Sequence, residues 1–80
     1  MDTYKAVRDR LLELLGEKKM SIHKLAMESA VAPSSIKNII YGKSQNPGVV
    51  TIKMLCDGLG ITLNDFFDTD KFRDLDQEIK

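Results

Sequence analysis

Apolar residues recur every three or four positions along most of the chain, which is the spacing of one face of an α-helix. The clearest case lies between residues 4 and 17, where Tyr4, Val7, Leu11 and Leu14 form one stripe. A half-buried strand would instead alternate apolar and polar residues, and no segment does so for long enough. The pattern therefore predicts an all-α protein.

Residues typical of helix ends divide this pattern into five predicted helices. Ser21 can accept a hydrogen bond from a free N–H of the next turn, and Pro33 suits a first helical position. Gly42 suits the left-handed position after a helix, and Thr62 with Asp65 matches a capping box. The helices are predicted at about 4–17, 22–29, 33–41 and 49–59, with a fifth after Thr62.

Two apolar stripes fall outside this five-helix pattern. Leu12 and Leu15 form a second stripe on the first helix, and Phe72, Leu75 and Ile79 form another on the acidic C-terminal segment. Because two unmatched stripes are most simply buried against each other, we expect the last ten residues to form a short helix packed on the first. The alternatives are a frayed tail and pairing of the stripes across a dimer.

Eighty residues allow one domain, which we assign to residues 1–68, with residues 69–80 as an acidic amphipathic extension. The chain has one cysteine, no apolar run of membrane-spanning length and no secretory leader at its start. These features predict a small cytoplasmic protein.

Charge is unevenly distributed, although the whole chain has a net charge of zero. Residues 18–53 contain six basic residues and one acidic residue, whereas residues 54–80 contain three basic and seven acidic residues. Such asymmetry indicates a surface that faces a polyanion, with an acidic remainder. The alternative is a pair of ordinary solvated faces.

Catalytic and metal-binding chemistry finds little support in the sequence. His23 is the only histidine and has no neighbour to orient it, so a surface role is expected. Cys56 lies on the apolar face of its helix and is predicted to be buried. No metal-ligand set or glycine-rich phosphate loop is present. We therefore predict no enzyme, no cofactor and no metal.

Residues 21–41 have the organisation of a helix-turn-helix unit, with two short helices joined by three residues. Ala26 is small enough for a close crossing, Ile36 fills that crossing, and Val31 anchors the turn. The second of these helices places Ile36, Ile39 and Ile40 on one face. Its other face carries short polar side chains that can reach base edges in a major groove.

The sequence around this unit resembles the Cro/repressor-type, or XRE-like, helix-turn-helix family from about residue 7 to residue 67. The residues that carry the resemblance are Leu25-Ala26, Val31, Ser35-Ile36, Gly42-Lys43, Asn46-Pro47, Leu59-Gly60-Ile61 and Asp65-Phe66-Phe67. The resemblance implies a five-helix, lambda-repressor-like DNA-binding domain of a bacterial or phage regulator that acts as a dimer.

The resemblance also assigns roles to individual residues. Those implied to read bases are Pro33, Ser34, Lys37 and Asn38. Those implied to contact the DNA backbone are Ser21, Lys43, Ser44 and Asn46, and we expect His23 and Tyr41 to join this group. The chain departs from the family pattern at Ala30, where Gly is usual, and at Ala32, where a Ser or Thr cap is usual. Pro33 can offer a base only an apolar contact, for example to a thymine methyl group.

Our leading hypothesis is a sequence-specific DNA-binding transcriptional regulator, acting as a repressor on the nucleoid as a homodimer. The alternative is an antitoxin-like or adapter module on the same fold, whose acidic C-terminal end docks a basic protein partner. No membrane association is expected.

Overall fold

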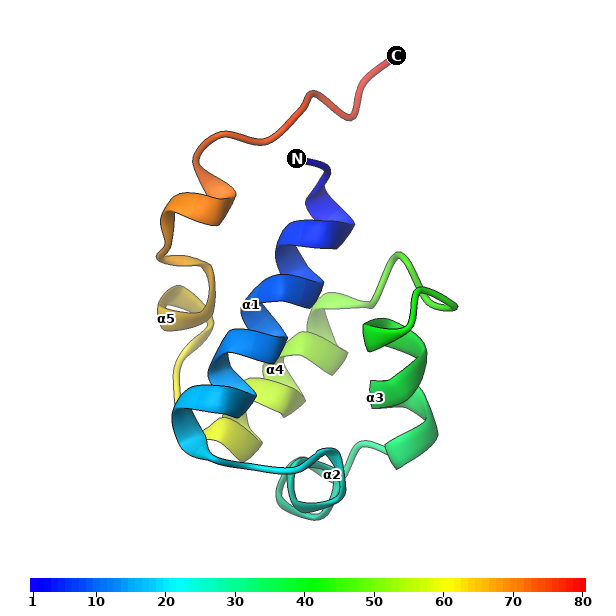
Figure 1. The fold of residues 1–80 in the computed structure, drawn as a ribbon, viewed down its shortest axis with the longest axis vertical. Helices are drawn as coiled ribbons and strands as arrows, with labels where there is room; N and C mark the ends of the chain where they lie inside the picture. The colour runs from blue at the N-terminus through cyan, green and yellow to red at the C-terminus, as the bar shows by residue number, and fades with distance from the viewer.

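Five α-helices and one short 3-10 helix make up the computed structural model, which describes all 80 residues (Figure 1). The elements are α1 (Thr3–Lys18), α2 (Ile22–Ser29), α3 (Pro33–Ile40), α4 (Val49–Leu59), α5 (Leu63–Phe67) and the 3-10 helix η1 (Asp70–Phe72). The structure contains no strand, so the prediction of an all-α fold is confirmed. None of the helices combines the length and the apolar composition that a membrane crossing requires.

Helix ends lie close to the predicted positions because the capping residues act as expected. The Ser21 hydroxyl accepts a hydrogen bond from the Lys24 N–H at 3.0 Å. Thr62 and Asp65 form a reciprocal capping box at the start of α5. Gly60 ends α4 in the left-handed conformation, with φ of 75°. Each of these contacts satisfies backbone groups that a helix end leaves without a partner.

A single apolar core joins the five helices. It contains fully buried side chains from every helix, among them Leu11, Leu25, Ile36, Leu55 and Phe66. In Figure 1, α1 crosses the middle of the molecule, with α5 on one side and α3 on the other. The helix-turn-helix unit is therefore held on a packed core.

The second stripe predicted on α1 does not exist as a separate surface. Leu15 belongs to the main core, whereas 44% of Leu12 is exposed. The two residues are three positions apart, but the core covers only one of them. The expectation that both would be buried by the C-terminal segment is wrong for Leu12.

The predicted terminal helix is also wrong for most of its length. Only Asp70–Phe72 is helical, as one 3-10 turn, and residues 74–80 have no regular structure. Ile79 is exposed, and Leu75 is half-buried. So short a segment needs tertiary packing to stay helical, and aspartate is a poor helix former.

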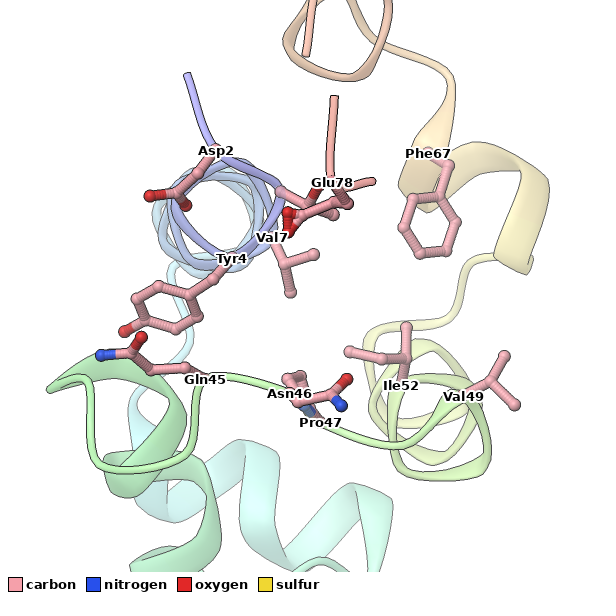
Figure 2. Close-up of a pocket in the computed structure, with 11 residues that line it drawn as sticks. Asp2, Tyr4, Val7, Gln45, Asn46, Pro47, Val49, Ile52, Phe67 and Glu78 are labelled. Carbon is pink, nitrogen blue, oxygen red and sulfur yellow. The ribbon is translucent and has the colours of Figure 1, made fainter. Parts of the chain in front are cut away.

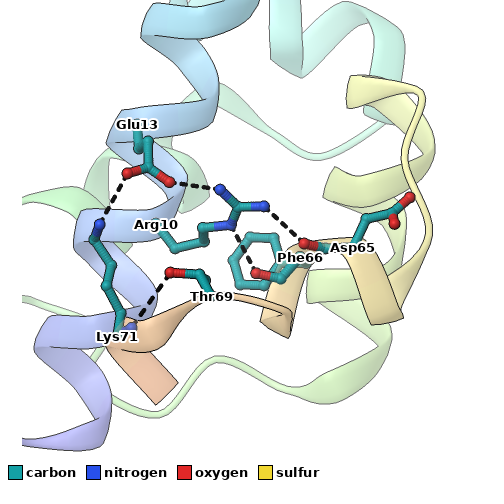
Figure 3. Close-up of polar contacts among 6 residues, drawn as sticks. All are labelled: Arg10, Glu13, Asp65, Phe66, Thr69 and Lys71. Atoms are coloured by element: carbon teal, nitrogen blue, oxygen red, sulfur yellow. Dashed lines mark hydrogen bonds and ion pairs between the residues drawn. The ribbon is translucent and has the colours of Figure 1, made fainter. Parts of the chain in front are cut away.

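The first part of the C-terminal segment does pack on the domain, through aromatic and ionic contacts. The Phe72 ring lies 4.9 Å from the Phe67 ring, centre to centre, in an edge-on arrangement. The Lys71 ammonium group contacts the Glu13 carboxylate at 2.8 Å, which attaches η1 to α1 (Figure 3). The segment beyond reaches the chain start, where the Asp76 N–H donates to the Met1 carbonyl at 3.1 Å.

Arg10 is the centre of the polar network that connects α1 with α5 (Figure 3). Its guanidinium group donates to the carbonyl oxygens of Asp65 and Phe66, each at 2.7 Å. It also contacts the Glu13 carboxylate at 2.5 Å. Hydrogen bonds from Lys71 and Arg10 to Glu13 hold the pKa of that carboxyl below its ordinary value. Arg10 therefore supplies partners for carbonyls near the end of a five-residue helix.

Candidate DNA-binding surface

The α2–α3 unit is fixed by a tight turn with a buried centre. Val31 is buried in the core, and its N–H donates to the Ser29 hydroxyl at 3.3 Å. Ala30, which stands where the family pattern has glycine, adopts the left-handed conformation with φ of 59°. Ala32 provides no side-chain cap for α3, as predicted.

Close backbone contact between α2 and α4 sets the position of this unit on the core. A Cβ atom added to Gly58 on α4 would lie 2.8 Å from the Ser29 Cβ and 2.9 Å from the Ser29 nitrogen. The two helices can therefore approach this closely only because residue 58 has no side chain. The sequence interpretation gave Gly58 no role, because an isolated glycine inside a helical pattern does not reveal its neighbour.

Helix α3 has two distinct faces. Ile36 and Ile39 are buried in the core. Ser34, Lys37 and Asn38 are exposed and lie one to four positions apart, so they share the opposite face. The structure thus brings together three of the four predicted base-reading residues in a single polar surface, and it places half-buried Pro33 at the first position of the same helix.

Two hydrogen bonds hold the C-terminal end of α3 in place. The Tyr4 hydroxyl on α1 donates to the Ile39 carbonyl at 2.6 Å. The Ser44 N–H donates to the Asn38 carbonyl at 2.9 Å. The sequence did not predict the hydrogen bond from Tyr4, because its apolar stripe assigned Tyr4 only to the core. A tyrosine in such a stripe is a sign of a buried polar contact, because its hydroxyl needs a partner.

The predicted backbone-contact residues lie in three places: after α3, at the start of α2 and in a groove beside α4. Tyr41, which is 75% exposed, and Lys43 directly follow the helix. Ser21 and His23 lie at the start of α2, where the Ser21 hydroxyl is already engaged as a cap. Asn46, by contrast, lines a groove between α1 and α4.

This groove has a volume of about 620 Å³ and a largely apolar lining (Figure 2). Val7 on α1, Ile52 on α4 and Phe67 on α5 contribute its walls. Glu78, from the C-terminal segment, and Asn46 contribute polar groups. The groove thus lies among the chain termini, α4 and the loop that follows α3.

Positive charge on the unit comes from lysines without acidic partners. Lys37 and Lys43 form no ion pair, and neither do Lys18 and Lys19 before α2. The acidic C-terminal segment lies beside the N-terminus of α1, well away from α2 and α3 in Figure 1. The acids of the C-terminal segment are therefore separated in space from the lysines around α3, whereas Asp57 on α4 pairs with Lys53.

The two residues considered for catalysis have the environments that the sequence predicted. Cys56 is buried, and burial raises the pKa of its thiol, so the thiolate is disfavoured. His23 is exposed on α2.

Comparisons with known proteins agree with this geometry. A family model described as a Cro/C1-type HTH DNA-binding domain matches residues 10–71. Among solved structures, the crystal structure of the prophage Lp1 protein 11 is similar, with a TM-score of 0.79 and 29% sequence identity. The similarity covers 94% of this chain and 100% of the other. Comparison with curated proteins gives no match.

Proposed function

Because the chain belongs to the Cro/C1-type helix-turn-helix DNA-binding family, we propose that it represses transcription by reading a specific sequence with α3 in the major groove. As a DNA-binding regulator it is not an enzyme. The observation that carries the proposal is the exposed polar face of α3 opposite the buried Ile36 and Ile39. A domain of this size that covers its site can repress by occupancy alone.

The exposed side chains of α3 have the chemistry of base readers. Asn38 can pair its amide with the N6 and N7 atoms of adenine, and Lys37 can donate to the O6 and N7 atoms of guanine. Ser34 can donate or accept, and Pro33 offers an apolar contact. We assign these four residues to sequence recognition.

Contacts to the DNA backbone are assigned to residues on either side of this face. Lys43 is the strongest candidate because it is exposed, cationic and without an ion-pair partner. The other members of this group are Ser21, His23, Tyr41, Ser44 and Asn46. Residues 1–68 would then form the DNA-binding domain. Residues 69–80 would keep most of the acids away from DNA in a cytoplasmic, nucleoid-bound protein.

A homodimer on DNA is the second part of the proposal. Val49 and Val50 are 67% and 70% exposed at the start of α4, and the half-exposed Phe67 lines the adjacent groove. An exposed apolar surface of this kind is typical of a self-complementary contact. A two-fold dimer would present two α3 helices to half-sites roughly one DNA turn apart.

The dimer is tested by solution mass. Light scattering should give twice the chain mass for the wild type and a lower mass for Val49→Glu. Glutamate at the first position of a helix is favourable, so the variant should fold. Met27→Glu, which changes an exposed apolar residue on α2, is the control. A monomeric wild type bound to a two-half-site duplex as one copy would contradict the dimer.

Sequence-specific binding is tested by selecting bound duplexes from a random pool. The proposal expects a recurrent motif, and binding to random duplex that weakens steeply with salt. Retention of no duplex even at low salt would contradict the proposal and favour the adapter alternative.

A further inference from the structure

A shallow apolar hollow lies where α2, the turn and α3 meet. It has a volume of about 360 Å³. Met27 on α2, Ala30 and Ala32 in the turn and Pro33 on α3 line it, and His23 is its only polar side chain. Met27 is 76% exposed, so the hollow has an apolar wall that stands in solvent. Its other two lining residues, Ala26 and Val31, belong to the core, and it shares no lining residue with the groove beside α4.

Where the hollow meets the first residues of α3, it offers almost no groups that can donate or accept a hydrogen bond. Ala32 makes no side-chain cap, and Pro33 has no N–H. Polar side chains begin only at Ser34. If α3 enters a major groove, as proposed above, its first residues can make only apolar contacts with base edges.

The major groove has one apolar group that distinguishes bases, which is the C5-methyl of thymine. We propose that this hollow accepts the C5-methyl group of a pyrimidine, so that the first turn of α3 selects thymine, or 5-methylcytosine, which carries a methyl group at the same position. This inference rests on the proposed function and specifies which base feature the unit recognises.

Two details of the lining support a methyl-binding role. Ala30 keeps a left-handed conformation that glycine would adopt without steric cost, and its methyl group contributes to the lining. Met27 is flexible and polarisable, which suits it to cover a small apolar group. Enclosing one methyl group should raise affinity about fourfold, the effect of burying one CH₂-sized group.

The test replaces thymine by deoxyuridine, which removes only the methyl group, at each position of the selected duplex in turn. Affinity is measured by fluorescence anisotropy at constant salt. We expect about a fourfold loss at one thymine of each half-site and no change at the others. At that same position, 5-methylcytosine should bind about fourfold better than cytosine.

Pro33→Ser tests whether the hollow is responsible, since serine is accepted at a helix start and removes the apolar ring. Its ratio of thymine to deoxyuridine affinities should fall to about one, whereas Leu12→Ala, on an exposed site of α1, should keep the wild-type ratio. Circular dichroism checks that both variants are helical. Equal binding of thymine and deoxyuridine at every position, no gain from cytosine methylation, or an unchanged ratio in folded Pro33→Ser would overturn the inference. These results presuppose specific binding, so a chain that binds no duplex would refute the proposed function instead.

Discussion

Replacing Gly58 with alanine should destabilise the domain, although alanine is the better helix former. The new methyl group would lie 2.8 Å from the Ser29 Cβ, 2.9 Å from the Ser29 nitrogen and 3.0 Å from the Ser29 Cα. Two of these atoms belong to the backbone of α2, so they cannot move aside as the end of a flexible side chain would. The variant would have to push α2 away from α4.

The magnitude follows from two opposing terms. Alanine gains about 1 kcal/mol over glycine inside a helix, whereas overpacking a tight contact costs about 1–3 kcal/mol, occasionally more. A contact with backbone belongs at the upper end of that range, so we expect a net loss of about 1–2 kcal/mol. In a domain of this size, 1 kcal/mol corresponds to about 4–8 °C in Tm. Gly58→Ala should therefore melt roughly 5–15 °C below the wild type.

Gly16→Ala is the matched control. Gly16 also lies inside a helix, but a Cβ atom there would have no neighbour within 4 Å. This variant should gain about 1 kcal/mol, so its Tm should rise. Thermal and urea unfolding followed by circular dichroism compare the two variants. If both substitutions stabilise the protein, the close α2–α4 crossing does not exist.

Three further predictions concern the network at α1 and the basic loop. Arg10→Ala should lower the free energy of unfolding by about 1.5–3 kcal/mol, since it removes charged hydrogen bonds to two α5 carbonyls; a loss below about 0.5 kcal/mol in urea unfolding would contradict that role. Glu13 has a lowered pKa in the folded state, so its contribution to stability is complete above its unfolded pKa and is lost as pH falls through the folded pKa. Between about pH 5 and pH 2, the free energy of unfolding should therefore decrease more steeply for the wild type than for Glu13→Gln. An equal decrease in the two proteins would exclude the effect. Lys43→Ala should weaken binding to all duplexes alike and reduce the salt slope by about one, whereas Lys80→Ala, in the C-terminal segment, should keep the slope; a loss confined to one duplex would argue against a phosphate contact.

The helices and their ends could be predicted because their determinants are local. The Ser21 cap, Pro33 at a first helical position and the Thr62–Asp65 capping box each act within four residues. The polar face of α3 was predictable for a related reason, since the isoleucines on its other side had to be buried. The same periodicity misled at Phe72, Leu75 and Ile79, because Phe72 packs on the domain from a single 3-10 turn and Ile79 is exposed, so the spacing does not reflect a helix.

The contacts that could not be predicted connect residues far apart in the sequence. The bond from Tyr4 to the Ile39 carbonyl spans 35 positions, and those from Arg10 to α5 span 55 and 56. The approach of Gly58 to Ser29 depends on how two helices cross. None of these leaves a periodic pattern, because each depends on tertiary packing rather than on helical spacing.

The most direct test of the account is the affinity of Asn38→Ala for the selected duplex and for a scrambled one at the same salt concentration. If α3 reads bases, the variant should lose about 1–3 kcal/mol on the selected duplex, or roughly 5- to 150-fold in Kd. Its affinity for the scrambled duplex should equal that of the wild type, because contacts to the backbone are intact. Unaltered affinity for the selected duplex, in a variant shown to be folded, would contradict the assignment of α3 as the reading helix.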